Sequence, residues 1–184
     1  MINNGFKSDN WKSLEENRNY LKGDYCKYKN HVYRVYHLWL KIDKQTENTD
    51  KYAIASAFHD LGIWSHQTFD YLEPSINQAK EYLDNIEKPD RKDEIASMID
   101  MHHKRSNYLG RNEKTVETFR RADWIDITKG RMNFKINRKE IQELQERFPI
   151  LGFHRFLLKQ TVKNFLNHPL NPLPMFKKWV NKAN

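Results

Sequence analysis

Apolar residues recur at the three- and four-residue spacing of an α-helix along most of this 184-residue chain. No stretch alternates apolar and polar residues over the length of a strand. Glycine and proline, which interrupt helices, occur only six times each. The pattern therefore predicts an all-α fold. A chain of this length can bury one hydrophobic core, so we expect a single helical domain over residues 1–184.

The expected helices follow from the apolar stripes and from capping and helix-breaking residues. The first has Asp9 or Asn10 as its N-cap, and the third has Thr49 or Asp50. In chain order they cover about residues 9–21, 30–42, 49–60, 74–86, 91–103, 113–129, 138–147 and 153–166, followed by a short helix that ends at Trp179.

Three polar residues lie on the stripes that their helices are expected to bury. His31 shares its stripe with aliphatic residues four, seven and eleven positions later, and His102 and Asp123 lie on similar stripes. A buried, ionised carboxylate is costly unless it is paired or bound to a metal. Asp123 therefore needs a partner, either a salt bridge to Arg120 or Arg121 or a metal ion.

An adjacent His59-Asp60 pair ends the apolar run AIASAFHD. With His31 and Asp123 it makes a set of two imidazoles and two carboxylates. Such a mixed set suits a divalent metal that activates water, and helical bundles build metal sites from ligands on different helices. Asp126 lies one turn beyond Asp123 and is a candidate to orient a ligand histidine.

The remaining histidines are weaker candidates. His37 lies six residues after His31, which turns it well away around the helix, so a surface or core position is favoured. His66 and Asp70 follow the His59-Asp60 pair, where they either line a pocket or lie in a loop; we favour the loop for His66.

The net charge is +8, with 32 Lys and Arg against 24 Asp and Glu. This charge favours anionic partners such as phosphates, nucleotides or nucleic acid, although lysine-rich solvated helices also produce it. The lack of clustered aromatic and basic residues disfavours sequence-specific binding of nucleic acid. The cations that could contact a phosphate near the candidate ligands are Lys104, Arg105, Arg111, Arg120 and Arg121.

A single cysteine, Cys26, excludes an internal disulfide and favours a cytoplasmic location. Residues 1–12 have no apolar core of signal-peptide length, and no segment has the roughly 20 apolar residues of a membrane span. We therefore expect a cytoplasmic protein without a membrane segment. No Walker-type phosphate loop, GxGxxG motif or zinc-finger spacing is present.

These motifs together resemble the HD-domain superfamily of metal-dependent phosphohydrolases. The pattern of that family is a His, a later His-Asp pair and a distal Asp, which NHVYRVYHLWL, ASAFHDLGIW and FRRADWIDI supply here. The resemblance covers about residues 28–128, and residues 138–184 would pack on that core. It implies a helical bundle of the HD type in which His31, His59, Asp60 and Asp123 bind a divalent ion, such as Mn, Fe, Co, Ni, Zn or Mg.

Members of this family with two metals have additional histidines near the position of His102 and His103. Only this one pair is present here, so it either completes a second metal site, contacts phosphate or donates a proton. We favour His102 for the pocket because it lies on the buried stripe.

The resemblance implies hydrolysis of a small phosphorylated substrate or nucleotide, as a phosphomonoesterase or phosphodiesterase. Asp60 would assist deprotonation of the metal-bound water, and His102 would be a second catalytic group. Two alternatives stay open. One is non-phosphate chemistry on the same scaffold, as in a hydratase or an iron oxygenase. The other is a non-catalytic protein that binds nucleotide or nucleic acid.

Overall fold

The computed structural model describes residues 11–177, which form α-helices joined by loops and short 3-10 turns. No strand occurs within these residues, so the predicted all-α class is confirmed. None of the helices described is both long enough and apolar enough to cross a membrane.

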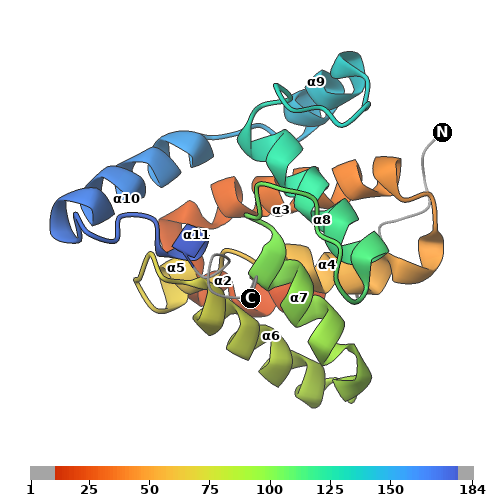
Figure 1. Ribbon diagram of the computed structural model, residues 1–184, viewed down its shortest axis with the longest axis horizontal. Helices are drawn as coiled ribbons and strands as arrows, with labels where there is room; N and C mark the ends of the chain where they lie inside the picture. Colours follow the sequence, from red (N-terminus) through yellow and green to blue (C-terminus); the bar gives the residue numbers. More distant parts are fainter. Residues whose placement is uncertain (1–10, 178–184) are drawn as a thin grey trace.

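The helices follow one another in the order shown in Figure 1. They are α1 (Lys12–Glu16), α2 (Arg18–Leu21), α3 (Tyr25–Ile42), α4 (Thr49–Phe58), α5 (Gly62–Ser65), α6 (Leu72–Asn85), α7 (Lys92–Met101), α8 (Glu113–Ile127), α9 (Arg138–Arg147), α10 (Phe153–Asn167) and α11 (Pro174–Lys177). The 3-10 turns are η2 (Lys22–Asp24), η3 (Thr46–Asn48) and η4 (Pro89–Arg91).

Four helices form the centre of the bundle. Helix α3 packs against α4 and α8, while α7 packs against α4, α6 and α8. Their facing sides bury aliphatic and aromatic side chains such as Val35, Trp39, Phe58, Ile99 and Phe119. This arrangement brings together the four helices on or beside which the polar candidates lie.

The prediction of one continuous helix over residues 9–21 is wrong. The chain instead forms α1 and α2, separated at Asn17, whose side-chain amide donates a hydrogen bond to the Ser13 carbonyl at 2.7 Å. That carbonyl would otherwise accept the backbone N–H of residue 17 in a continuous helix. The predicted burial of Leu14 and Leu21 is confirmed, and the N-cap predicted at Asp9 or Asn10 lies outside the described residues.

Other helix boundaries also differ from their predictions, for example α7, which ends at Met101 and not at His103. Helix α3 begins five residues earlier than expected, because Tyr25 and Tyr28 extend its buried stripe. Asn48, not Thr49 or Asp50, occupies the N-cap position of α4. That helix ends at Phe58, so the His59-Asp60 pair lies in the turn that follows. The helix end predicted at Trp179 lies outside the described residues.

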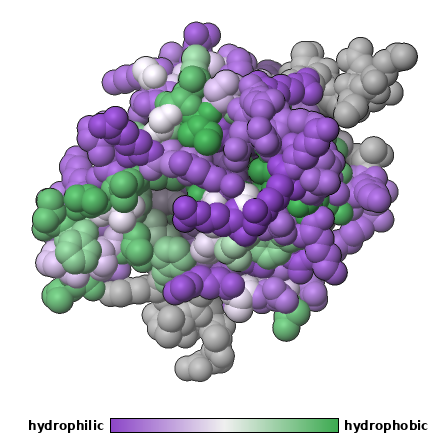
Figure 2. All heavy atoms as spheres, turned by 90° about the horizontal axis from the view of Figure 1, so that it is seen from above, coloured by the Kyte–Doolittle hydropathy of each residue, from purple (hydrophilic) through white to green (hydrophobic). Residues whose placement is uncertain are grey.

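Helices α9 and α10 both contact α3, and α10 runs along one side of the molecule (Figure 1). Phe153, at the start of α10, is fully buried. The outer side of the same helix exposes Leu158, Val162, Phe165 and Leu166. Figure 2 shows hydrophobic side chains gathered at the end of the molecule where α10 lies, whereas most of that face is hydrophilic.

Candidate metal centre

The structure brings His31, His59, Asp60, His102 and Asp123 together in the middle of the bundle. His31 lies on α3 and Asp123 on α8, while His59-Asp60 and His102 directly follow the ends of α4 and α7. All five side chains are buried, with at most 2% of any residue exposed. Four different helices therefore position one polar cluster inside an apolar core.

The turn that carries His59-Asp60 is held by close packing at Gly62. A β-carbon on Gly62 would lie 2.5 Å from the carbonyl oxygen of Tyr71, so no larger residue fits without a shift of the backbone. The Gly62 N–H also donates to the Ser75 hydroxyl at 2.9 Å. The glycine thus allows the segment after His59-Asp60 to pack closely against the start of α6.

The ligating atoms of the first four predicted residues converge. The Nε2 atoms of His31 and His59 are 2.9 Å apart. Each lies 3.4–3.7 Å from Oδ2 of Asp60 and from Oδ1 of Asp123. Metal bonds of about 2.0–2.2 Å place neighbouring donor atoms about 3–3.6 Å apart, so these separations fit one bound ion.

Hydrogen bonds fix the orientation of the histidines beside the helix ends. Nδ1 of His59 is 2.8 Å from the Ser56 carbonyl, and Nδ1 of His102 is 2.6 Å from the Ile99 carbonyl. A carbonyl oxygen only accepts, so each Nδ1 carries the hydrogen and donates it. In the neutral ring, Nε2 then presents a lone pair to the cluster.

His31 is oriented by a buried carboxylate instead. Its Nδ1 donates to Oδ2 of Asp126 at 2.7 Å. Arg34 donates two hydrogen bonds to the same carboxylate, from Nε at 2.6 Å and from Nη2 at 2.9 Å. Burial alone would raise the pKa of Asp126, but the charge of Arg34 and the hydrogen bonds hold that pKa well below its usual range. Asp126 is therefore ionised, and it occupies the orienting position that the sequence suggested.

The atoms that face the centre of the cluster are hydrogen-bond acceptors without a donor within residues 11–177. Oδ1 of Asp60, Oδ1 of Asp123 and Nε2 of His102 have no hydrogen-bond partner among the described residues. Burying such acceptors is costly unless a cation satisfies them. Burial alone would lower the pKa of His59, but the carboxylates of Asp60 and Asp123 raise it to about 9. The cluster therefore attracts a positive charge, which either a proton or a metal ion can supply.

A salt bridge to Arg120 or Arg121 does not account for Asp123. Arg120 and Arg121 donate instead to Glu117, with Nε–Oε distances of 2.7 and 2.8 Å. The alternative in which either arginine pairs with Asp123 is therefore wrong, since both guanidinium groups point to the preceding turn of α8. Arg105 and Arg111 are exposed.

The two histidines after α7 differ in burial. Nε2 of His102 is 3.5 Å from Oδ1 of Asp60. His103 is half-buried, and its Nε2 forms a hydrogen bond with the Tyr71 hydroxyl. Burial and the neighbouring His102 lower the pKa of His103 to about 3, so its ring is neutral. Ligating atoms of Asp60, His102 and His103 lie within 4.8 Å of one another, so Asp60 belongs to two groups that could each hold an ion.

Two residues at the start of α10 contribute to the cluster without a recognisable motif. The ring of Phe153 stacks on His31 with centroids 4.2 Å apart. Nε2 of His154 is 3.0 Å from the backbone carbonyl of Asp126. Sequence reasoning assigned no role to Tyr71 or to Arg34. A buried arginine on an apolar stripe was the one signal that could have identified Arg34.

The other polar candidates lie away from the cluster. His37 stacks on Phe148 with centroids 5.2 Å apart. His66 and Asp70 are exposed in the loop between α5 and α6, as favoured for His66.

Comparison with known proteins gives one match. The family model described as HD domain matches residues 28–128, a segment that contains His31, His59, Asp60, His102 and Asp123. No match was found among curated proteins or among solved structures.

Proposed function

The chain belongs to the HD-domain family of metal-dependent hydrolases, and on this premise we propose that it hydrolyses a phosphate ester or nucleotide with metal-activated water. The observation that carries the proposal is a buried cluster of potential metal-ligating atoms. It consists of three imidazole Nε2 atoms and two carboxylates. Their separations fit a bound ion, and the proposed ligands are His31, His59, Asp60 and Asp123.

A bound divalent ion would supply a water of lowered pKa and would polarise a phosphoryl oxygen. The residues of the chain do the remaining work. Asp126 and Arg34 hold His31 in the tautomer that presents Nε2, and the Ser56 carbonyl does the same for His59. These outer contacts stiffen the site before any substrate arrives.

Asp60 and His102 are the proposed catalytic groups. Oδ1 of Asp60 faces Nε2 of His102 at 3.5 Å, and neither atom has another partner among residues 11–177. A proton released by the attacking water can therefore be taken up at Oδ1 of Asp60 or at Nε2 of His102. A proton taken up at Nε2 of His102 is then available for the leaving oxygen.

The donor set favours particular metals. Imidazole nitrogens suit Fe, Co, Ni and Zn, while carboxylates also suit Mn and Mg. Elemental analysis of the purified protein should find one of these metals. His59→Ala should lose it, whereas His66→Ala, which changes an exposed histidine outside the cluster, should retain it.

Hydrolytic turnover should depend on the bound metal ion. We expect turnover of a phosphomonoester, a phosphodiester or a nucleotide when the protein is screened with each of these ions. Asp60→Asn and His59→Ala should lower turnover by at least about 100-fold, and His66→Ala should leave it unchanged. A protein that binds no metal, or whose turnover survives both cluster substitutions, would contradict the proposal. Iron-dependent oxygen consumption in place of hydrolysis would also contradict it.

A further inference from the structure

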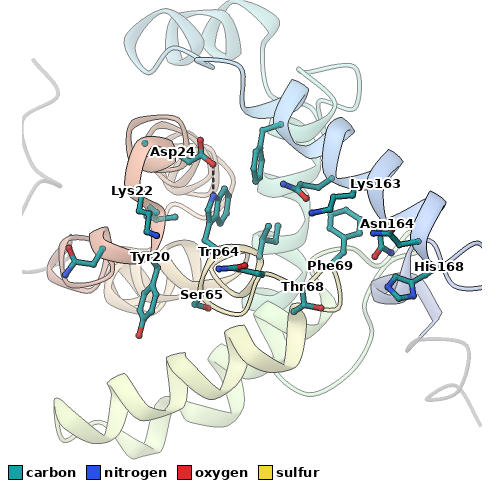
Figure 3. Close-up of a pocket in the computed structure, with 18 residues that line it drawn as sticks. Tyr20, Lys22, Asp24, Trp64, Ser65, Thr68, Phe69, Lys163, Asn164 and His168 are labelled. Atoms are coloured by element: carbon teal, nitrogen blue, oxygen red, sulfur yellow. Dashed lines mark hydrogen bonds between the residues drawn. The ribbon is translucent and has the colours of Figure 1, made fainter.

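A cavity lies away from the metal centre. It has a volume of about 610 Å³ and lies between the η2 turn, helix α5 with its following loop, and α10 (Figure 3). This volume is typical of small-molecule sites. None of the candidate metal ligands lines it.

Unpaired positive charge reaches the cavity from two elements. Lys22 on η2 and Lys163 on α10 approach it from opposite sides (Figure 3). Neither ammonium group forms a salt bridge with another residue in the range 11–177. The nearby carboxylate of Asp24 does not neutralise them, because its oxygens accept from Lys27 at 2.6 Å and from the Trp64 indole at 2.9 Å. The cavity therefore favours an anionic ligand.

One side of the cavity is lined by apolar and aromatic side chains. The rings of Trp64 and Phe156 stack with centroids 4.9 Å apart and planes at 9°. Ile63 and Phe69 extend this side, and the half-exposed ring of Tyr20 lies at the opposite edge. The hydrogen bond from Trp64 to Asp24 fixes the indole. Because Phe156 and Tyr28 both contact Trp64, this side of the cavity offers apolar contact to a ligand but no free face of the indole.

Amide side chains supply the remaining polarity. Asn19, Gln67, Gln160 and Asn167 line the cavity, and none of their side chains forms a hydrogen bond within the described part of the chain. Each amide can both donate and accept. This combination matches the ring edges and hydroxyl groups of a nucleoside.

Strained backbone occurs on two facing segments of the cavity. Lys22 has φ 47° and ψ −124°, and Gln67 has φ 50°. Residues other than glycine rarely adopt positive φ, and such conformations cluster at ligand sites, where the surrounding structure holds them. Both strained residues also contribute side chains to the cavity.

We propose that this cavity is a second ligand site, which binds a phosphorylated small molecule rich in hydrogen-bonding groups, such as a nucleoside diphosphate. The two lysines would contact the phosphates, and the amides and the apolar side would contact the nucleoside. The site is distinct from the metal centre because none of the candidate ligands lines it. Tyr28 contacts residues of both sites, with its ring centroid 4.8 Å from that of Trp64 and 6.3 Å from that of His59.

Calorimetric titration of the full chain with ADP, GDP, CDP and UDP tests this proposal. At least one nucleotide should bind, and Lys22→Ala and Lys163→Ala should each weaken binding about tenfold, as expected for loss of one charged contact. Lys159→Ala is the matched control, because it removes the same charge from α10 at a position that does not line the cavity. It should leave the dissociation constant within about twofold.

The same titration on His59→Ala separates the cavity from the metal centre. Binding in the cavity should persist in this variant, while the hydrolysis proposed above should be lost. The inference is overturned if none of the four nucleotides binds at up to about 1 mM. It is also overturned if binding disappears in His59→Ala, or if Lys159→Ala weakens binding as much as Lys163→Ala does. Circular dichroism should show that each variant is folded.

Discussion

The hydrogen bonds behind the imidazoles decide which nitrogen each histidine presents to the cluster. His59 and His102 both use the carbonyl three residues earlier, a group left free where a helix ends. His31 lies within α3, where the backbone carbonyls are engaged, and it uses the Asp126 side chain instead. The three histidines thus have the same orientation, but the acceptor is a backbone carbonyl for His59 and His102 and a side chain for His31. Only the orientation of His31 therefore depends on a group that a substitution can remove.

Asp126→Asn tests that dependence. The substitution preserves shape but removes the charge that balances Arg34 and weakens the acceptor for Nδ1 of His31. We expect metal affinity to fall about 10- to 100-fold and the free energy of unfolding to fall by about 3–5 kcal/mol, as for a broken buried ion pair. Metal titration and urea denaturation measure the two effects.

Asp84→Asn is the control for that substitution. Asp84 pairs with Lys92 at the surface, and its side chain is 55% exposed. Removing this charge should cost at most about 1 kcal/mol and leave metal affinity unchanged. Unchanged metal affinity in Asp126→Asn would show that Asp126 stabilises the fold without orienting His31.

The raised pKa of His59 predicts how the metal-free protein responds to pH. An imidazole in the unfolded chain titrates near about 6.5, whereas the pKa of folded His59 is about 9. The protonated form therefore stabilises the folded state fully below about pH 6.5, and that contribution is lost as pH rises through 9. The loss should be about 3 kcal/mol, measured as the fall in unfolding free energy across this range.

Metal should abolish this pH dependence, because a coordinated His59 carries no proton on Nε2. Metal affinity should correspondingly rise with pH across the same range, as metal and proton compete for one nitrogen. A metal-free protein whose stability is flat or rises between those pH values would contradict the charge balance inferred for the cluster.

At the scale of helices, the sequence predicted what local spacing determines. Residues 138–147 were predicted from their stripe, and α9 has those bounds. The break at Asn17 was missed because it depends on one side-chain hydrogen bond to Ser13, which a periodic pattern does not register. His31, His102 and Asp123 were found for the same local reason, since each is polar on a stripe that must be buried.

The contacts between distant helices were not predictable in this way. Arg34 reaches Asp126 and Phe153 reaches His31 only after the bundle has formed. Their partners lie about 90 and 120 positions away in the chain, and no spacing rule connects them. The ligand roles of His31, His59, Asp60 and Asp123 stay predictions, although the structure brings their ligating atoms together.

Gly62→Ala tests how α5 positions the His59-Asp60 turn. The added carbon would lie 2.5 Å from the Tyr71 carbonyl, so α5 must move away from the start of α6. We expect a loss of about 1–3 kcal/mol of stability, as for overpacking of a core, together with weaker metal binding. Gly23→Ala is a close control because nothing lies within 4 Å of its added carbon. A Gly62→Ala protein as stable as the control would contradict the packing argument.

At the scale of the whole molecule, the C-terminal helices touch the metal centre from outside the matched segment. Nη1 of Arg34 donates to the Phe148 carbonyl at 2.8 Å, and Phe153 covers one face of His31. Met175 on α11 packs in a buried cluster with Ile63, Tyr71 and Leu72. Residues beyond 128 therefore contact the side chains of the metal centre and its neighbours directly.

Such sharing predicts that the chain unfolds as one domain. If the contacts at Arg34, His31 and Tyr71 couple the two parts, urea denaturation curves from circular dichroism and tryptophan fluorescence should coincide. Phe153→Ala should shift that single transition by about 3–5 kcal/mol, because it leaves a cavity against His31. Leu158→Ala, on the exposed side of the same helix, should cost less than about 0.5 kcal/mol. Two separate transitions, with Phe153→Ala moving only the first, would instead mean that the C-terminal helices unfold while the metal centre stays intact.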